Sequence, residues 1–263
     1  MDLALAGRVA IVTGGTSGVG LACVRGFLEE GADVAFCGRD EGRLERARAT
    51  FAEMTGADRI LATRCDVTKT EDVQAFAKAV TAWRGRADML INNAGEGRVS
   101  TFATTTDEQW RAELELKYFS QVLPIRAFKP LLDASDAPSI TAVNSLLAYQ
   151  PEPHMVCTSS ARAGVQSLLK SLAGEFAPAI RVNTVMLGLI ESGQWERRFE
   201  ARADKSQSRD EWLGALARSK HIPRGRLGKP EEVARAVIFL ASPSASYITG
   251  ASLEISGGVS RFI

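Results

Sequence analysis

The chain has 263 residues, of which 45% are hydrophobic and 24% are charged, close to the averages of a globular protein. This composition excludes disordered, collagen-like and small disulfide-rich classes, and the length suits one α/β domain of roughly 250 residues. The 32 Lys and Arg against 31 Asp and Glu leave a formal net charge of +1. No overall field then attracts nucleic acid or an anionic membrane, and a small-molecule partner is favoured.

Cysteine usage and hydropathy concern the compartment. The four cysteines form no C-x-x-C pair, which argues against a zinc site or a disulfide framework and fits a reducing environment. No apolar run approaches the roughly 18 residues of a membrane span, and the N-terminus carries Asp2 and no basic segment before its apolar stretch. We expect a cytoplasmic protein with buried thiols and no bound metal.

Short apolar runs bounded by Gly, Asp or Asn alternate with longer segments of helical periodicity. The runs predict strands at Val9–Val12, Asp33–Cys37, Arg59–Cys65, Met89–Ile91, Ser139–Asn144, Arg181–Leu187 and Ala251–Ile255. Alternating strands and helices predict an α/β fold, a doubly wound parallel sheet of about seven strands with helices on both faces, in a single domain over 1–263. Ligands then bind at the carboxyl ends of the strands.

Two segments stand out from this alternation. The predicted helix over 107–131 is apolar on two faces, which is typical of a buried helix or a subunit interface. The charged stretch 191–228 contains Trp195, Phe199 and Trp212 but no strand pattern, as a substrate-covering insertion or a surface excursion would. Its Arg197, Arg198 and Arg202 would either bind a carboxylate or phosphate or form a solvated helix face.

A glycine-rich turn follows the first predicted strand. Thr13-Gly14-Gly15-Thr16-Ser17-Gly18-Val19-Gly20 has the spacing G-x-x-x-G-x-G and leads into a helix. Glycines let the backbone approach a pyrophosphate, whose charge faces the N–H groups at the helix N-terminus. The turn alone is a weak indication, because a purely structural turn has the same composition.

Further motifs make the pattern specific. They are T-G-G-T-S-G-V-G at 13–20, C-D-V at 65–67, N-N-A-G at 92–95, Ser145 at the end of a strand, R-V-N at 181–183, G-R-L-G-K-P-E-E-V-A from Gly225 and T-G-A at 249–251. In this order and spacing the chain resembles the classical short-chain dehydrogenase/reductase family over essentially its whole length. The resemblance implies a Rossmann-like domain, a nicotinamide cofactor and a homodimer or homotetramer.

The resemblance also assigns cofactor contacts by position. It implies phosphate contacts at the glycine-rich turn, adenine and ribose contacts after the third and fourth strands, and nicotinamide contacts after the sixth, although Leu187 stands where the family usually has Pro. The implied residues are Gly14, Thr16, Ser17, Gly18, Val19, Gly20, Asp66, Val67, Asn93, Ala94, Gly95, Arg162, Gly188, Ile190 and Ser192.

The end of the second strand bears on the choice of cofactor. An acidic residue there would accept hydrogen bonds from the ribose 2′-hydroxyl of NAD. This chain has Cys37-Gly38-Arg39 instead, and a guanidinium can bind a 2′-phosphate through two hydrogen bonds. We therefore expect NADP(H) rather than NAD(H), although Arg39 as a solvated loop residue is the alternative.

The catalytic positions depart from the family. In the family a Ser orients the substrate carbonyl, a Tyr thirteen residues later transfers the proton, and a Lys four residues after that lowers the tyrosine pKa. From Ser145 these counts give Thr158 and Arg162, and the family's Asn position, counted from Trp110, gives Lys117. An aliphatic hydroxyl is a far weaker acid than a phenol, so Thr158 is a poor proton donor.

Two residues are candidates to replace the missing acid. Lys117 would reach the site from the neighbouring helix with its pKa lowered beside Arg162, or else serve as a structural ion-pair partner. His154 is expected one turn before Thr158 on the same helix, because Pro151-Glu152-Pro153 is typical of a helix start, or else it only lines the pocket. Tyr118 and Tyr149 are fainter candidates.

Two functions remain open from the sequence. The first is an NADP(H)-linked oxidoreductase acting on a carbonyl/alcohol or activated C=C substrate, with Ser145 orienting it and Lys117 or His154 handling the proton. The second is a cofactor-binding pseudoenzyme that acts as a redox sensor or scaffold. The intact cofactor motifs favour the first, and the Thr–Arg pair in place of Tyr–Lys favours the second.

Overall fold

The computed structural model describes residues 2–262 and is built on one seven-stranded sheet. Every neighbouring pair of strands is parallel, in the order β3-β2-β1-β4-β5-β6-β7. In chain order the strands are β1 (Val9–Thr13), β2 (Asp33–Gly38), β3 (Ile60–Arg64), β4 (Met89–Asn92), β5 (Ser139–Ser145), β6 (Arg181–Leu187) and β7 (Ser252–Ile255). The predicted strands are confirmed, with ends that differ by at most one residue.

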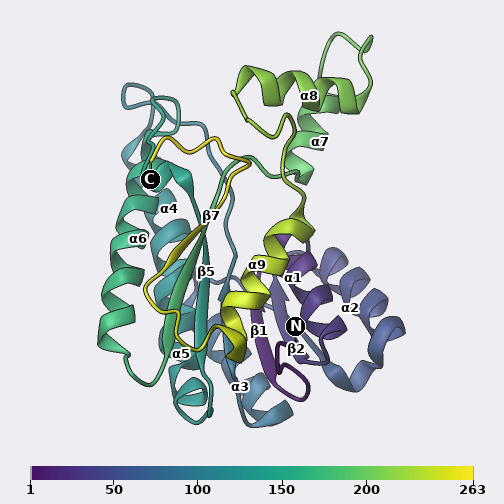
Figure 1. The fold of residues 1–263 in the computed structure, drawn as a ribbon, viewed down its shortest axis with the longest axis vertical. Helices are drawn as coiled ribbons and strands as arrows, with labels where there is room; N and C mark the ends of the chain where they lie inside the picture. Colours follow the sequence, from purple (N-terminus) through teal and green to yellow (C-terminus); the bar gives the residue numbers. More distant parts are fainter. Residues whose placement is uncertain (1, 263) are drawn as a thin grey trace.

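Helices cover both faces of the sheet, as predicted (Figure 1). In the described part of the chain the α-helices are α1 (Gly18–Glu29), α2 (Glu41–Thr55), α3 (Thr70–Arg84), α4 (Asp107–Leu114), α5 (Ser120–Asp133), α6 (Val156–Glu175), α7 (Gly193–Glu200), α8 (Arg209–Ser219) and α9 (Pro230–Ala241). Helices α1, α2 and α9 pack on one face, and α3, α5 and α6 pack on the other. No helix among residues 2–262 is long and apolar enough to cross a membrane.

The central strands are buried on both sides, which explains their uninterrupted apolar runs. All five residues of β1 are buried, as expected for a parallel strand that lies between two helical layers. The aromatic pair Phe36–Phe51 lies in one core layer, with ring centroids 5.9 Å apart, and Phe76–Phe128 lies in the other, at 5.3 Å. The four cysteines are free thiols and buried, as predicted.

The helix predicted over 107–131 is interrupted. A π-helical segment, η2 (Glu115–Phe119), separates α4 from α5. It lies just before Pro124, which lacks the N–H that would bond to Ser120 and whose ring would clash with that carbonyl. Single π-helical turns of this kind are frequent at functional sites, and this one carries Lys117.

Helices α7 and α8 rise above the carboxyl ends of the strands, separate from the layers around the sheet (Figure 1). They belong to the predicted insertion 191–228, which contains no strand. Leu213 and Ala217 of α8 form a small apolar cluster with Ile222 and Leu227, and Trp195 packs against it. The insertion therefore has its own small core above the sheet.

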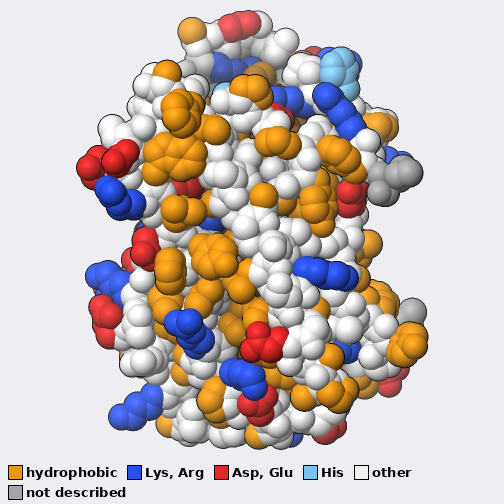
Figure 2. Space-filling model, turned by 90° about the vertical axis from the view of Figure 1, so that its left-hand side faces the viewer, with side chains coloured by type: hydrophobic (Ala, Val, Ile, Leu, Met, Phe, Trp, Pro, Cys, Tyr) orange, Lys and Arg blue, Asp and Glu red, His pale blue; other side chains and the backbone are white. Residues whose placement is uncertain are grey.

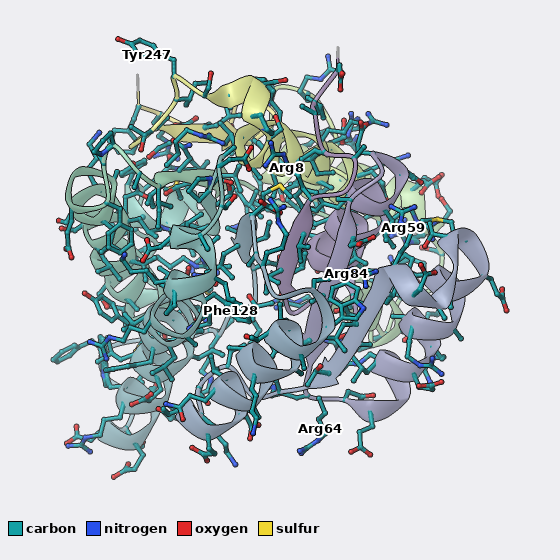
Figure 3. The ribbon with its side chains drawn as sticks, turned by 90° about the horizontal axis from the view of Figure 1, so that it is seen from below. Arg8, Arg59, Arg64, Arg84, Phe128 and Tyr247 are labelled. Carbon is teal, nitrogen blue, oxygen red and sulfur yellow. The ribbon has the colours of Figure 1, made fainter. Side chains whose placement is uncertain are left out.

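The opposite end of the sheet, at the amino ends of the strands, is held by ion pairs (Figure 3). Arg8 binds Asp136 at 2.8 Å and lies 3.5 Å from Asp88. Arg59 and Arg84 both bind Asp33, the first residue of β2, at 3.3 and 2.7 Å. These three arginines are thus each paired with a carboxylate of the same chain.

Candidate active site

A cavity of about 1190 Å³ lies along the carboxyl ends of the strands, under α7. All the predicted cofactor residues except Gly20 line it. The lining members are Gly14, Thr16, Ser17, Gly18, Val19, Arg39, Asp66, Val67, Asn93, Ala94, Gly95, Arg162, Gly188, Ile190 and Ser192. The fold therefore brings together residues that are far apart in the sequence.

The glycine-rich turn is shaped by close backbone contacts. Gly14 has φ +68°, and a Cβ on Gly20 would lie 2.2 Å from the Gly14 carbonyl oxygen, so neither position tolerates a side chain. The Asn93 side chain donates to the carbonyls of Thr13 and Gly14 at 3.0 and 3.2 Å. Gly20 thus allows α1 to pack closely against the turn. The first residues of α1 line the cavity, and the N–H groups of a helix N-terminus suit a bound phosphate.

The end of β2 presents basic side chains to the cavity. Arg39 and Arg43 both line it, and Arg43 lies 3.4 Å from the Asp40 carboxylate. Within residues 2–262 no carboxylate lies within 4.0 Å of the Arg39 guanidinium. A Cβ on Gly38 would lie 2.6 Å from Thr16, which explains why the residue before Arg39 is a glycine.

Ser145 lies at the mouth of the cavity, where β5 ends. It caps the short 3-10 turn Leu146–Ala148, and its Oγ accepts a hydrogen bond from the Leu147 amide at 3.2 Å. The same hydroxyl lies 3.4 Å from the carbonyl oxygen of Leu187, its partner on β6. The side chain is thus fixed at the edge of the cavity, where a hydroxyl can orient a bound carbonyl.

Arg162 forms part of the cavity wall from α6. One Nη donates to Asn144 Oδ1 at 3.2 Å and contacts the Val143 carbonyl at 3.4 Å, while the buried Nε has no partner in the described protein. Burial lowers the pKa of Arg162 to about 10, so the guanidinium remains charged at neutral pH. A buried N–H donor without a partner is costly, and a ligand oxygen would satisfy it.

Lys117 and Thr158 do not reach the cavity, because a buried carboxylate holds both. The Lys117 Nζ lies 3.1 Å from Glu113 Oε1 and also donates to the Glu96 carbonyl, and the Thr158 hydroxyl donates to Glu113. All three side chains are buried. Burial, with the charge of Arg162, lowers the pKa of Lys117 to about 8, and Glu113 opposes this shift. The ion-pair alternative for Lys117 is the arrangement observed.

His154 lines the cavity but lies outside the helix. The expectation that it begins the helix one turn before Thr158 is wrong, because α6 begins at Val156. Ser100 holds this stretch extended: its N–H donates to the His154 carbonyl at 2.9 Å and its carbonyl accepts from the Val156 amide at 3.2 Å. The half-exposed imidazole lies 3.1 Å from the Glu152 carboxylate.

The fainter tyrosine candidates lie elsewhere. The Tyr149 hydroxyl lies 3.2 Å from Ser252 Oγ, and Tyr118 packs near Gly164 on α6. Neither side chain lines the cavity.

Two site residues were missed from the sequence. Glu113 joins Lys117 to Thr158, and Asn144 holds the guanidinium of Arg162. The spacing of four residues between Glu113 and Lys117 is that of helical neighbours, so the pair was detectable. The burial of this pair could not be predicted from the sequence, because it depends on the packing of α4 against α6.

The chain is similar to known proteins over nearly its whole length. Residues 14–260 match the family described as enoyl-(acyl carrier protein) reductase. The 3-oxoacyl-[acyl-carrier-protein] reductase of Chlamydia muridarum is 31% identical over 261 residues, which is 98% of this chain and 100% of that protein.

The chain also resembles solved structures, in fold and in sequence. A short chain oxidoreductase from Pseudomonas aeruginosa PAO1, described as containing an atypical catalytic center, is 54% identical. Its apo structure superimposes with a TM-score of 0.96 over 100% of both chains, and its NADPH-bound structure with 0.92 over 97% of this chain and 98% of that one. L-Sorbose reductase from Gluconobacter frateurii, complexed with NADPH and L-sorbose, is 33% identical with a TM-score of 0.95 over 100% of both chains.

Proposed function

Because the chain belongs to the short-chain dehydrogenase/reductase family, whose members are oxidoreductases, we propose that it uses NADPH to reduce a carbonyl or activated C=C group of a small molecule. One observation carries this proposal. Ser145, His154 and Arg162 line the same cavity as the glycine-rich turn, whereas Lys117 and Thr158 lie outside it. A hydroxyl, a proton donor and a fixed positive charge are then available beside the cofactor.

The free donor of Arg162 supports cofactor binding at this place. Its Nε needs an acceptor, and the guanidinium lies beside the cavity wall at Gly95, where a Cβ would be 4.0 Å from one Nη. A hydroxyl of the cofactor ribose would accept from this donor, and Ser192 with Gly188 would border the nicotinamide. When bound, the cofactor supplies the hydride.

Arg39 and Arg43 support a preference for the phosphorylated cofactor. Both line the cavity after the end of β2. Asp40 lines it as well, but it lies 3.4 Å from Arg43, and no carboxylate lies within 4.0 Å of the Arg39 guanidinium among residues 2–262. The Pseudomonas oxidoreductase and L-sorbose reductase were each observed with NADPH.

The side chains suggest how a carbonyl is reduced. The Ser145 hydroxyl donates to the carbonyl oxygen and fixes its position. With hydride transfer to the carbon, His154 would give a proton to the oxygen, and the Glu152 carboxylate, 3.1 Å from the imidazole, would hold the ring in place. Because His154 is half-exposed, solvent can restore the proton. Arg162 stabilises the negative charge that develops on the oxygen.

The proton donor is tested by substitution after screening NADPH oxidation with ketones, enones and acyl thioesters. We expect His154→Phe to lower kcat by about 10²–10⁴-fold, the usual cost of losing a general acid. Thr158→Val should change it far less, because Thr158 faces Glu113. His221→Phe is the matched control, since this second histidine also lines the cavity. Full activity in His154→Phe that is lost in Lys117→Met would assign the proton to Lys117 instead.

Cofactor choice is tested by calorimetry. The protein should bind NADPH at least about tenfold more tightly than NADH, because the guanidinium of Arg39 binds the 2′-phosphate. Arg39→Ala should remove most of this difference, whereas Arg46→Ala, on α2 outside the cavity, should keep it. Equal affinities of the unmodified protein for both cofactors would rule out the preference.

Apolar side chains on the α6 side support a symmetric dimer or tetramer. Figure 2 shows hydrophobic side chains gathered on this face of the molecule. Among the exposed large hydrophobic residues, Leu114 and Phe119 belong to α4 and η2, which pack beside α6. A helix apolar on two faces has one face left for a second copy. Light scattering at micromolar concentration should give a dimer or tetramer, and a monomeric mass would exclude this assembly.

A further inference from the structure

The substrate half of the cavity has an excess of positive charge. Arg197 and Arg198 reach it from α7, Lys220 from the end of α8, and Arg261 from the C-terminal segment. Away from the ends of β2 and β3, three carboxylates line the cavity, Glu96, Glu152 and Glu191. The imbalance raises the question of what neutralises these guanidinium groups.

The acidic neighbours of α7 already have a partner. Arg209 binds Glu191 at 2.8 Å and Glu196 at 2.7 Å. The third acidic residue, Glu200, does not line the cavity. Consequently no carboxylate lies within 4.0 Å of the Arg197 or Arg198 guanidinium among residues 2–262.

The charge partners of the remaining residues in this part of the cavity can also be identified. Glu152 is shared by His154 at 3.1 Å and Lys220 at 3.7 Å. Arg261 has no carboxylate within 4.0 Å in the described chain, and its backbone N–H donates to Gln150. Within residues 2–262, Arg197, Arg198 and Arg261 therefore have no carboxylate partner.

Arg198 differs from an ordinary surface arginine because its side chain is supported. Its guanidinium lies 4.8 Å from the centroid of Trp195, which in turn packs against Trp212 with ring centroids 6.4 Å apart. Stacking on an aromatic face restricts a guanidinium while leaving its N–H edge free for a planar anion. Arg197 instead lies over Gly193, beside the predicted nicotinamide contact Ser192.

Arg202 provides an internal comparison. It stacks on Phe199 and Trp212 at 4.0 and 5.5 Å, as Arg198 stacks on Trp195. However, its N–H groups donate to the carbonyls of Phe199 and Gln207, and it does not line the cavity. Of two similarly stacked arginines, one stabilises the insertion and the other points its charge at the cavity.

We propose that Arg198, stacked on Trp195, binds an anionic group of the substrate, a carboxylate or a phosphate, above Ser145. This inference rests on the proposed function, because it assigns the substrate class of the same site. Arg197, Lys220 and Arg261 add to the field that attracts such an anion. The charge pattern thus favours an acidic carbonyl compound over a neutral sugar or ketone.

Binding without turnover tests the site directly. With NADPH saturating, so that the cofactor's phosphates occupy their own sites, inorganic phosphate is titrated by calorimetry at low ionic strength. We expect millimolar binding that Arg198→Gln weakens at least about tenfold and that Arg202→Gln leaves unchanged. Absence of phosphate binding, or equal binding by the Arg198→Gln variant, would overturn the proposal.

A matched pair of ketones then tests the substrate class. Acetoacetate should bind the protein saturated with NADP⁺ more tightly than methyl acetoacetate, and Arg198→Gln should abolish the difference. If Arg198→Gln weakens NADPH itself instead, the anion belongs to the cofactor and the substrate assignment is wrong. Anion binding without any NADPH oxidation in the screen would leave this site standing while the proposed reductase function fails.

Discussion

The arginine side chains at the two ends of the sheet differ in whether a carboxylate pairs with them. At the amino ends of the strands Arg8, Arg59 and Arg84 are each held by a carboxylate, and Figure 3 shows them together on this side of the molecule. At the carboxyl ends Arg39 and Arg198 line an open cavity with no carboxylate within reach in the described chain.

The arginines at the amino ends stabilise the fold through ion pairs, whereas we propose that those in the cavity bind a ligand. Asp88, fully buried at the amino end, accepts hydrogen bonds from the Val9 amide at 2.8 Å, from Ser135 at 2.6 Å and from Arg86 at 2.5 Å. Such a carboxylate has all its acceptor capacity used, so it stabilises the junction between β1 and β4 and cannot bind anything else. Arg39 and Arg198, in contrast, have no carboxylate within 4.0 Å among residues 2–262, so a bound anion would be their charge partner.

The largest effect is expected from breaking the amino end. Asp88→Asn removes the buried charge beside two arginines and turns an amide N–H₂ toward existing donors. We expect a loss of about 3–5 kcal/mol in the free energy of unfolding, measured in urea at fixed protein concentration. NADPH affinity below the unfolding transition should be unchanged.

Asp136→Asn is the control for this variant, because Asp136 is 72% exposed although it also binds Arg8. Its unfolding transition should coincide with that of the unmodified protein. If both variants lose the same stability, the two carboxylates share their role and burial is not the reason.

A smaller effect, dependent on pH, is expected from Lys117. Its pKa is about 8 in the folded protein against 10.5 for an ordinary lysine. Between these values the unfolded chain holds a proton on Lys117 that the folded chain does not, so the contribution of Lys117 to the free energy of unfolding rises with pH. The gain from pH 7.5 to 9.5 amounts to about 2 kcal/mol.

This contribution is isolated by a difference measurement. The rise should disappear in the double variant Lys117→Met with Glu113→Gln, which removes both buried charges. Lys129→Met, which breaks a surface pair with Asp133, should follow the unmodified protein. An identical pH dependence in all three proteins would show that Lys117 titrates in its ordinary range.

The smallest effect concerns a shared ion pair. Arg84→Met leaves Asp33 with its second partner, Arg59, so we expect a loss of only about 1 kcal/mol in urea unfolding. In an Asp33→Asn background the same substitution should cost less, since the charge that it pairs with is gone. If Arg84→Met lowers the free energy of unfolding as much as Asp88→Asn does, the second partner of Asp33 does not reduce the cost of losing the first.

The strands and the glycine-rich turn were predictable because local rules decide them. A run such as Val9–Val12 is apolar throughout because its strand is buried on both faces, and glycines mark where the chain must turn. The absence of a strand over 191–228 was predictable in the same way, from the missing strand pattern.

What could not be predicted depends on contacts between distant residues. The conformation of His154 is set by Ser100, more than fifty residues earlier, whose hydrogen bonds delay the start of α6. Likewise, the side chains of Glu113 and Thr158 meet only because α4 packs on α6. Motif spacing places a residue along a helix, but it does not tell which neighbour occupies its hydrogen bonds.

The hydrogen bond from Thr158 to Glu113 has a consequence for how this site can change. A tyrosine that followed the direction of the Thr158 hydroxyl would meet the buried Glu113 carboxylate. Loss of that hydroxyl would leave Lys117 as the remaining side-chain partner of Glu113 among residues 2–262. Position 158 is therefore coupled to positions 113 and 117 through one buried carboxylate. We expect a substitution at 158 alone to lower the free energy of unfolding, because it leaves part of that carboxylate without a donor.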